Sequence, residues 1–166
     1  MLRMSKLADY GTVVMAAMAR APDHIHSAAN VADQTGLALP TASKVLKALA
    51  RGSLLVSVRG AKGGYLLART PREISIAQVI GAMEGPIGVT ECSSVPGLCL
   101  QEAGCSVRTN WQRINHMVIR ALEQITLEQM TQPIRKTVEI SMIKAPAIRK
   151  RLQQPGVNRP PAGAQP

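Results

Sequence analysis

Apolar side chains recur every three to four residues along much of this chain, which predicts a mostly helical protein. The first stretch with this spacing covers residues 5–20. The same spacing predicts three further helices, over residues 27–34, 40–51 and 75–84. Ser27 suits the N-terminal cap of the helix over 27–34, because its hydroxyl can accept a first-turn amide. Pro40 suits the first turn of the next helix, where an amide hydrogen is not needed.

Two short β-type runs, residues 54–58 and 65–68, follow the third helix. The six residues between them contain three glycines, which permit a hairpin turn, and two cations, Arg59 and Lys62. Two short helices followed by a basic hairpin predict a winged helix-turn-helix with the hairpin as the wing. The alternative is a bundle with a solvated basic hairpin. A phosphate-binding P-loop fits less well, because Lys62 is followed by a glycine and a strand.

A long helix is predicted over residues 107–130. Its apolar residues repeat at spacings typical of a coiled-coil seam: Trp111, Ile114, Val118, Ala121 and Ile125. We expect this seam to pair two chains in a homodimer; the alternative is that it packs on the chain's own helices. The expected division is a winged-helix domain (1–84), a loop (85–106), a dimerisation helix (107–131) and a basic tail (132–166). In the tail we expect a short strand or helical turn over 138–142 and disorder over 153–166.

Composition and charge narrow the class of protein. Aromatic residues are 2% of the 166 residues and the net charge is +10, so an aliphatic core and an anionic partner are expected. Residues 1–70 carry a net charge of +6, residues 71–131 carry −2 and residues 132–166 carry +6. A basic domain of this kind indicates phosphate backbones or anionic membranes. With the winged helix, double-stranded DNA is the expected partner, and attachment of the tail to a membrane surface is the weaker alternative. No apolar run could span a bilayer and the N-terminus does not resemble a signal peptide, so we expect a cytoplasmic protein.

The three cysteines, Cys92, Cys99 and Cys105, lie within fourteen positions, separated by glycine, proline and serine. Such a loop could wrap three thiolates around zinc, copper(I) or an iron–sulfur cluster. The spacing differs from the paired C-x2-C of common zinc sites, which favours a cluster. The alternatives are three ordinary buried thiols or a disulfide, although an odd number of cysteines without an export signal disfavours a disulfide.

Several segments together resemble the bacterial winged-helix regulators that carry iron–sulfur clusters, the family of IscR and NsrR. The wing VSVRGAKGGYLLAR (56–69) is the most specific, followed by LPTASKVLKAL (39–49) and by ISIAQVIGAMEGP with ECSS (74–94). The resemblance extends from residue 1 to about residue 130. The opening SKLADYGTVVMAAMA, GLCLQEAGC and NWQRIN are most similar to the subgroup that regulates the SUF cluster-assembly operon.

The resemblance implies roles for individual residues. Cys92, Cys99 and Cys105 match the cluster ligands of the family, and [2Fe–2S] is expected in preference to [4Fe–4S]. Arg108 stands where IscR has a ligating histidine, so the fourth ligand is expected to be Asp9 of the partner subunit, with His116 as a weaker candidate. The residues expected to contact DNA lie on the third helix and the wing: Thr41, Ser43, Lys44, Lys47, Arg59 and Lys62. Arg59 matches an arginine that enters the minor groove, whereas Ser43 replaces a glutamate used in site discrimination.

The expected function is that of a dimeric transcription repressor that senses iron–sulfur cluster status and controls SUF-type assembly genes. The alternatives are a nitric-oxide-responsive or redox-responsive cluster repressor and a DNA-binding protein with structural zinc. An enzyme is not expected, because we find no nucleophile–base pair, paired carboxylates or cofactor loop; we therefore expect no small-molecule substrate.

Overall fold

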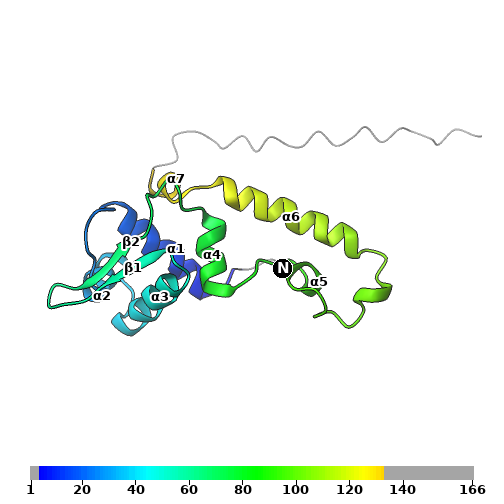
Figure 1. Ribbon diagram of the computed structural model, residues 1–166, viewed down its shortest axis with the longest axis horizontal. Helices are drawn as coiled ribbons and strands as arrows, with labels where there is room; N and C mark the ends of the chain where they lie inside the picture. Colours follow the sequence, from blue (N-terminus) through cyan, green and yellow to red (C-terminus); the bar gives the residue numbers. More distant parts are fainter. Residues whose placement is uncertain (1–3, 133–166) are drawn as a thin grey trace, which may run out of the picture. The chain divides into compact units, whose positions relative to one another are not determined.

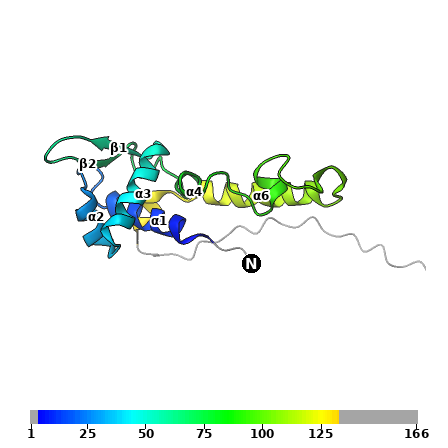
Figure 2. The ribbon, with the colours of Figure 1, turned by 90° about the horizontal axis from the view of Figure 1, so that it is seen from below.

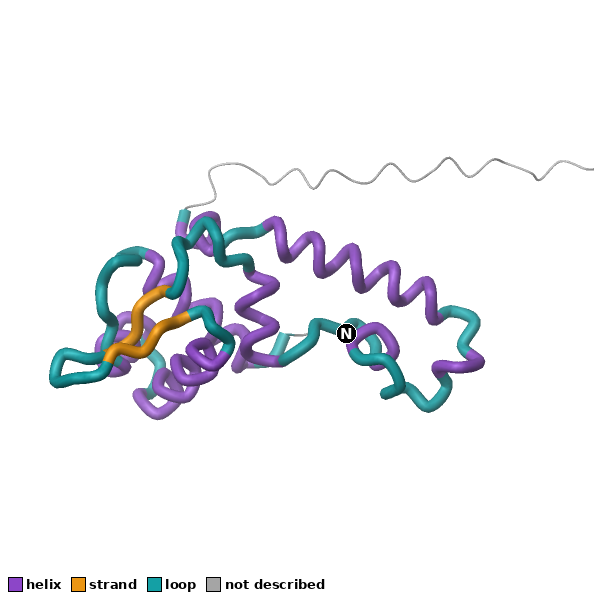
Figure 3. The backbone as a smooth tube through the Cα atoms, in the orientation of Figure 1, coloured by secondary structure: helices purple, strands orange, loops and turns teal. Residues whose placement is uncertain are grey.

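The computed structural model describes residues 4–132, and every structural statement below refers to this part of the chain. The expectations for residues 138–142 and 153–166, and nearly all of the tail, lie outside the described residues. In Figures 1 and 3 the elements follow one another as helices interrupted by a single two-stranded sheet. The prediction of a mostly helical chain with a hairpin wing is confirmed.

The helices and strands lie close to the predicted positions. The winged-helix part consists of α1 (Lys6–Ala19), α2 (Ala28–Thr35), α3 (Leu39–Arg51), β1 (Leu55–Val58), β2 (Gly64–Leu67) and α4 (Ile76–Glu84). The remaining elements are α5 (Glu91–Ser94), the 3-10 turn η1 (Glu102–Gly104), α6 (Arg108–Gln124) and α7 (Leu127–Thr131). Within these described elements, no helix is both long and apolar enough to cross a membrane.

Serine caps fix where three of the helices begin. The hydroxyls of Ser5, Ser27 and Ser75 accept backbone amides of the first turns of α1, α2 and α4. These bonds satisfy amides that have no partner inside the helix. Gly36 ends α2 with φ 71°, a left-handed conformation that glycine adopts without steric cost.

The core is aliphatic and rich in methionine, as the low aromatic content predicts. Met15 and Met18 of α1 are fully buried and pack in one cluster with Leu46 and Leu49 of α3. Helix α1 is central, since it packs against α2, α3, α4 and α7. A methyl group on Gly11 would lie 2.7 Å from Cγ of Met83, so glycine lets α1 and α4 approach closely.

The wing is an antiparallel hairpin joined to the chain before α2. Leu55 pairs with Leu67 and Val58 with Gly64. The backbone of Tyr65 exchanges two hydrogen bonds of 2.9 Å with that of His26, which forms a single antiparallel β-bridge beside the two-stranded sheet. This contact anchors the wing to the helices and fixes its direction.

The prediction of one helix over residues 107–130 is wrong, because the chain forms two helices there. Helix α6 ends at Gln124, Ile125 is extended, and α7 begins at Leu127. Thr126 and Gln129 form a capping box that starts α7 anew. Leu127 is fully buried among residues of the winged-helix core, and Ile125 therefore lies in the break between two helices.

Candidate nucleic-acid interface and cysteine loop

Helix α3 turns a basic face to solvent. Its apolar positions, including Val45 and Leu46, are buried in the core. This packing leaves Lys44, Lys47 and Arg51 exposed at spacings of three and four residues, which places them on one face of the helix. The structure thus presents three cations from neighbouring turns on one exposed surface.

A groove of about 400 Å³ lies beside this face, between α3 and the hairpin. It is lined by Lys44, Lys47, Ala50, Arg51, Ser57 and Tyr65. Ser57 and Tyr65 are directly opposite each other on β1 and β2, so their hydroxyls come from the two strands of the wing. The sequence reasoning did not propose these two as DNA contacts; the signal available was a polar position in an otherwise apolar strand.

The wing tip carries Arg59 and Lys62, both exposed as predicted. Its turn depends on glycine: Gly60 has φ 125°, and a methyl group on Gly63 would lie 2.4 Å from the carbonyl oxygen of Val58. In Figure 2 the loop between the strands extends beyond the helices. The turn thus holds two cations at a projecting end of the molecule.

Thr41 and Ser43 lie in the first turns of α3 and are half-buried. In a helix-turn-helix protein the first turns of the second helix contact base edges in the major groove. The positions of these two residues agree with that geometry. Their small hydroxyl side chains can donate or accept a hydrogen bond.

The cysteine loop places its three thiols in different surroundings. Cys92 lies on α5 and is buried, whereas Cys99 and Cys105 are half-exposed on the two sides of η1. All three lie within the described residues and are free thiols. The Thr90 hydroxyl is 3.4 Å from Sγ of Cys92, so a hydroxyl can donate to that sulfur.

These thiols are not gathered around one point. Among residues 4–132, no group of three or more His, Cys, Asp or Glu side chains is arranged to hold a metal ion. The donor set itself fits a soft metal or a cluster, because it consists of three thiols on a loop. Gly97, with φ 85°, and Gly104 give this loop room to close. A cluster on these cysteines would therefore require the loop to rearrange.

The other candidate ligands lie in three different environments. Asp9 is exposed in the first turn of α1, and His116 is exposed on α6. Arg108 forms an ion pair with Glu102, and Glu102 also accepts the amide of Gly97 over 2.6 Å. Glu102 therefore links Arg108, at the start of α6, to the Gly97 turn of the cysteine loop.

Sequence reasoning missed Asn115, which ties the start of this loop to α6. Its side-chain amide makes three hydrogen bonds to backbone groups of the loop, to Ile87, Val89 and Ser93. The visible signal was a polar residue next to the apolar seam of the helix. An asparagine there was indistinguishable in the sequence from an ordinary solvated residue.

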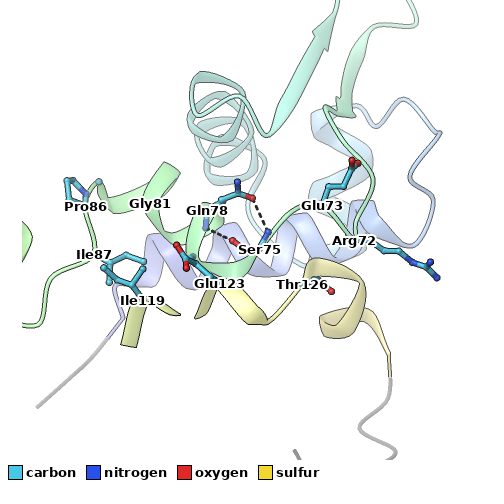
Figure 4. Close-up of a pocket in the computed structure, with 12 residues that line it drawn as sticks. Arg72, Glu73, Ser75, Gln78, Gly81, Pro86, Ile87, Ile119, Glu123 and Thr126 are labelled. Carbon is cyan, nitrogen blue, oxygen red and sulfur yellow. Dashed lines mark hydrogen bonds between the residues drawn. The ribbon is translucent and has the colours of Figure 1, made fainter. Parts of the chain in front are cut away.

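The seam residues of α6 are only partly covered by the rest of the described chain. Trp111 and Ile114 of the seam are each more than a third exposed, as is the neighbouring Met117, and Val118 is half-buried. Between α4 and α6 there is also a hollow of about 680 Å³ (Figure 4), lined in part by Gly81, Ile87 and Ile119. Helix α6 thus combines packing on the chain's own α4 and α5 with a seam that stays partly exposed.

The fold and this basic face define a winged helix-turn-helix transcription regulator. Over residues 4–133 the chain matches the family described as "Rrf2: Iron-dependent Transcriptional regulator", and it belongs to that family. It is 29% identical over 102 residues to the HTH-type transcriptional regulator IscR of Pectobacterium carotovorum, covering 61% of this chain and 62% of that protein. The match thus spans less than two thirds of that relative.

Two solved structures have the same fold. CymR, described as the global cysteine regulator of B. subtilis, is 28% identical, with a TM-score of 0.61 over 79% of this chain and 97% of that one. IscR of T. potens is 27% identical, with a TM-score of 0.59 over 78% of this chain and 85% of that one. The relatives are transcription regulators and not enzymes, which agrees with the expectation from the sequence.

Proposed function

We propose that the protein is a homodimeric, cytoplasmic repressor whose DNA binding is controlled by an iron–sulfur cluster on Cys92, Cys99 and Cys105. Its targets would be SUF-type cluster-assembly genes. The observation that carries the DNA-binding part is the basic groove between α3 and the wing. The sensing part is supported by the cysteine loop and by the family, whose description names iron dependence.

DNA binding would use both elements beside this groove. Lys44, Lys47 and Arg51 would neutralise backbone phosphates. Thr41 and Ser43 would contact base edges in the major groove, and Arg59 would enter the adjacent minor groove with Lys62 beside it. Operator DNA is thus the expected partner, with no small-molecule substrate.

Dimerisation would use the exposed face of α6. Three apolar side chains that are each more than a third exposed on one helix are a surface that pairing of two copies would bury. Two winged-helix domains held by a common axis would then read two operator half-sites at a fixed spacing.

The cluster would be held by the three thiolates of the loop and by Asp9 of the partner subunit, and we favour [2Fe–2S]. When bound, such a cluster supplies a redox-sensitive and degradable link between the loop's cysteines. The chain's own contribution is to hold Cys92 on α5 and to leave Cys99 and Cys105 on a loop with glycines. Cluster loss would release the loop and change the geometry of the two DNA-reading domains.

Anaerobic purification followed by a visible absorption spectrum, with iron and sulfide analysis, tests this function. We expect a brown protein with equimolar iron and sulfide that binds SUF-type operator DNA more tightly than its cluster-free form. A colourless protein with stoichiometric zinc would instead assign a structural metal. Rapid bleaching by nitric oxide with loss of DNA binding would identify nitric oxide as the signal.

A further inference from the structure

Asn115 fastens the first part of the cysteine loop, residues 87–93, to α6. Its Oδ1 accepts the backbone amide of Val89 over 3.0 Å, and its Nδ2 donates to the carbonyl oxygens of Ile87 and Ser93 over 3.1 and 3.0 Å. These three bonds join residues 22 to 28 positions apart in the chain. The amide group thus closes the turn that carries Cys92 onto the helix.

Because Asn115 is buried, losing these hydrogen bonds would cost free energy. Of the 17 residues of α6, all of which the structure describes, Asn115 alone is buried, with 4% of its surface exposed. A buried amide that loses its partners keeps its desolvation cost, so the arrangement favours one position of the loop. The same three hydrogen bonds therefore fix the position of the loop and the orientation of the Asn115 side chain.

The turn fastened by Asn115 is also tightly packed. A methyl group on Gly88 would lie 2.2 Å from Cβ of Ser94, so the two ends of the turn touch. Thr90 and Ser93 form a capping box around Cys92. Movement of the Cys92 backbone would therefore displace the adjacent Ser93 carbonyl that Asn115 binds.

Asn115 also adjoins the surface that we expect to form the dimer. Trp111 and Val118 lie at i−4 and i+3 from it, which places all three side chains on neighbouring parts of one helix face. A shift of Asn115 would thus act directly on the seam. Away from this contact, Ile119 and Glu123 of α6 line the hollow beside α4 (Figure 4).

We propose that Asn115 is the positioning residue that transmits the state of the cysteine loop to the dimer helix. This inference rests on the proposed function and names the regulatory link within it. Rearrangement of Cys92, Cys99 and Cys105 around a cluster breaks or shifts the bonds from Asn115 to the turn. The seam beside Asn115 then changes its orientation, and with it the spacing of the two DNA-reading domains.

The first test measures the loop alone, in full-length protein without cluster. Site-resolved maleimide labelling in wild type should modify Cys92 much more slowly than Cys99 or Cys105, because only Cys92 is buried. Asn115→Ala removes all three of these buried hydrogen bonds, so it should raise the Cys92 rate at least about tenfold and change the other two rates by less than about twofold. Gln112→Ala, which removes an exposed amide from the same helix, is the matched control and should behave as wild type.

A second variant covers the possibility that Asn115→Ala does not fold. Asn115→Asp keeps the shape and still accepts the Val89 amide, but its carboxylate cannot donate to the two carbonyl oxygens. It should also expose Cys92 while circular dichroism stays native. Unchanged Cys92 labelling in a folded variant of either kind would refute the fastening role.

The second test measures transmission as the ratio of operator affinities with and without cluster. In wild type this ratio should differ from one; in Asn115→Ala it should fall toward one while iron and sulfide content is retained, and Gln112→Ala should keep the wild-type ratio. A structural role alone would weaken both affinities and leave their ratio unchanged, and that result would refute transmission. A wild-type ratio of one would instead overturn the proposed sensing function, and transmission with it, while the labelling result would still stand.

Discussion

The backbone amide of Leu127 donates to the carbonyl oxygen of Ile74 over 2.8 Å, and both side chains are fully buried. Two residues earlier, the carbonyl oxygen of Ile125 accepts the amide of Ile76 over 2.9 Å. These two bonds fasten the chain after α6 to the start of α4. The chain therefore leaves the winged-helix domain after α4, passes through the cysteine loop and α6, and returns to the domain at Leu127.

Leu127→Ala should destabilise the winged-helix domain by about 2–5 kcal/mol, because it removes a fully buried side chain and leaves a cavity between α7 and α1. Chemical denaturation followed by circular dichroism measures the change. Met130→Ala, on the same short helix but 49% exposed, is the control and should change stability by less than about 0.5 kcal/mol. Equal effects of the two substitutions would show that α7 is not part of the core.

The sequence did not predict the helix break that precedes Leu127. The helices of the winged domain could be predicted because their buried faces repeat with helical spacing and their serine caps are local. The break at Ile125 could not, since it depends on hydrogen bonds to Ile74 and Ile76, about fifty positions earlier. The apolar repeat continues through the break, so it predicts one helix where two exist.

The same distinction applies to the candidate site. Lys44 and Lys47 could be assigned to an exposed face, because the apolar positions of α3 define its buried side. Ser57 and Tyr65 join them only through the pairing of β1 with β2. Asn115 acts through partners 22 or more positions away, and no local pattern identifies such bonds.

Charged residues on the seam of α6 should prevent dimerisation. Ile114→Glu combined with Val118→Glu would bury two unpaired carboxylates if the dimer formed, at a cost of about 3–5 kcal/mol for each. Sedimentation velocity should show monomers that no longer bind operator DNA. Gln112→Glu adds the same charge to an exposed position on another side of α6 and should remain dimeric. Dimers of normal stability in the double variant would assign the interface to another surface.

The salt dependence of DNA binding should identify the phosphate contacts. Removing Lys47 or Arg51 by alanine substitution should weaken binding to all sequences and lower the slope of log affinity against log salt by about one. Arg120→Ala, which removes an exposed cation from α6, should leave the slope unchanged. Arg59→Ala should weaken binding most at sites with a narrow A·T minor groove. Equal losses at all sites would make Arg59 a backbone contact.

Gly64→Ala should displace the wing. A methyl group there would lie 2.4 Å from the carbonyl oxygen of His26, so the bridge between Tyr65 and His26 must open. We expect a loss of stability of about 1–3 kcal/mol and weaker DNA binding without loss of dimers, measured by thermal unfolding, fluorescence anisotropy and sedimentation. Gly81→Ala is the matched control, since a methyl group there meets no atom within 4 Å and alanine favours the helix. If Gly64→Ala bound DNA with wild-type affinity, the wing would not be part of the DNA interface.

The cysteine substitutions test whether the three thiols are needed to bind iron but not to fold or dimerise. Cys92→Ala, Cys99→Ala and Cys105→Ala should each abolish the brown colour and the bound iron. Each variant should still fold and dimerise, because the core of α1, α3 and α4 and the exposed face of α6 contain none of the three thiols. Circular dichroism and sedimentation check folding and dimerisation, and iron analysis checks the cofactor.

Asp9→Ala tests the proposed fourth ligand. Asp9 is exposed on α1, so its removal should leave folding unchanged and speed cluster loss in air without preventing cluster assembly. His116→Ala, which removes the weaker candidate from α6, should leave the rate of cluster loss at the wild-type value. If Asp9→Ala loses its cluster at the wild-type rate while His116→Ala loses it faster, the ligand assignment must move from α1 to α6.

In cells, all three cysteine variants should derepress a SUF-type reporter, because the cluster-loaded form is expected to repress.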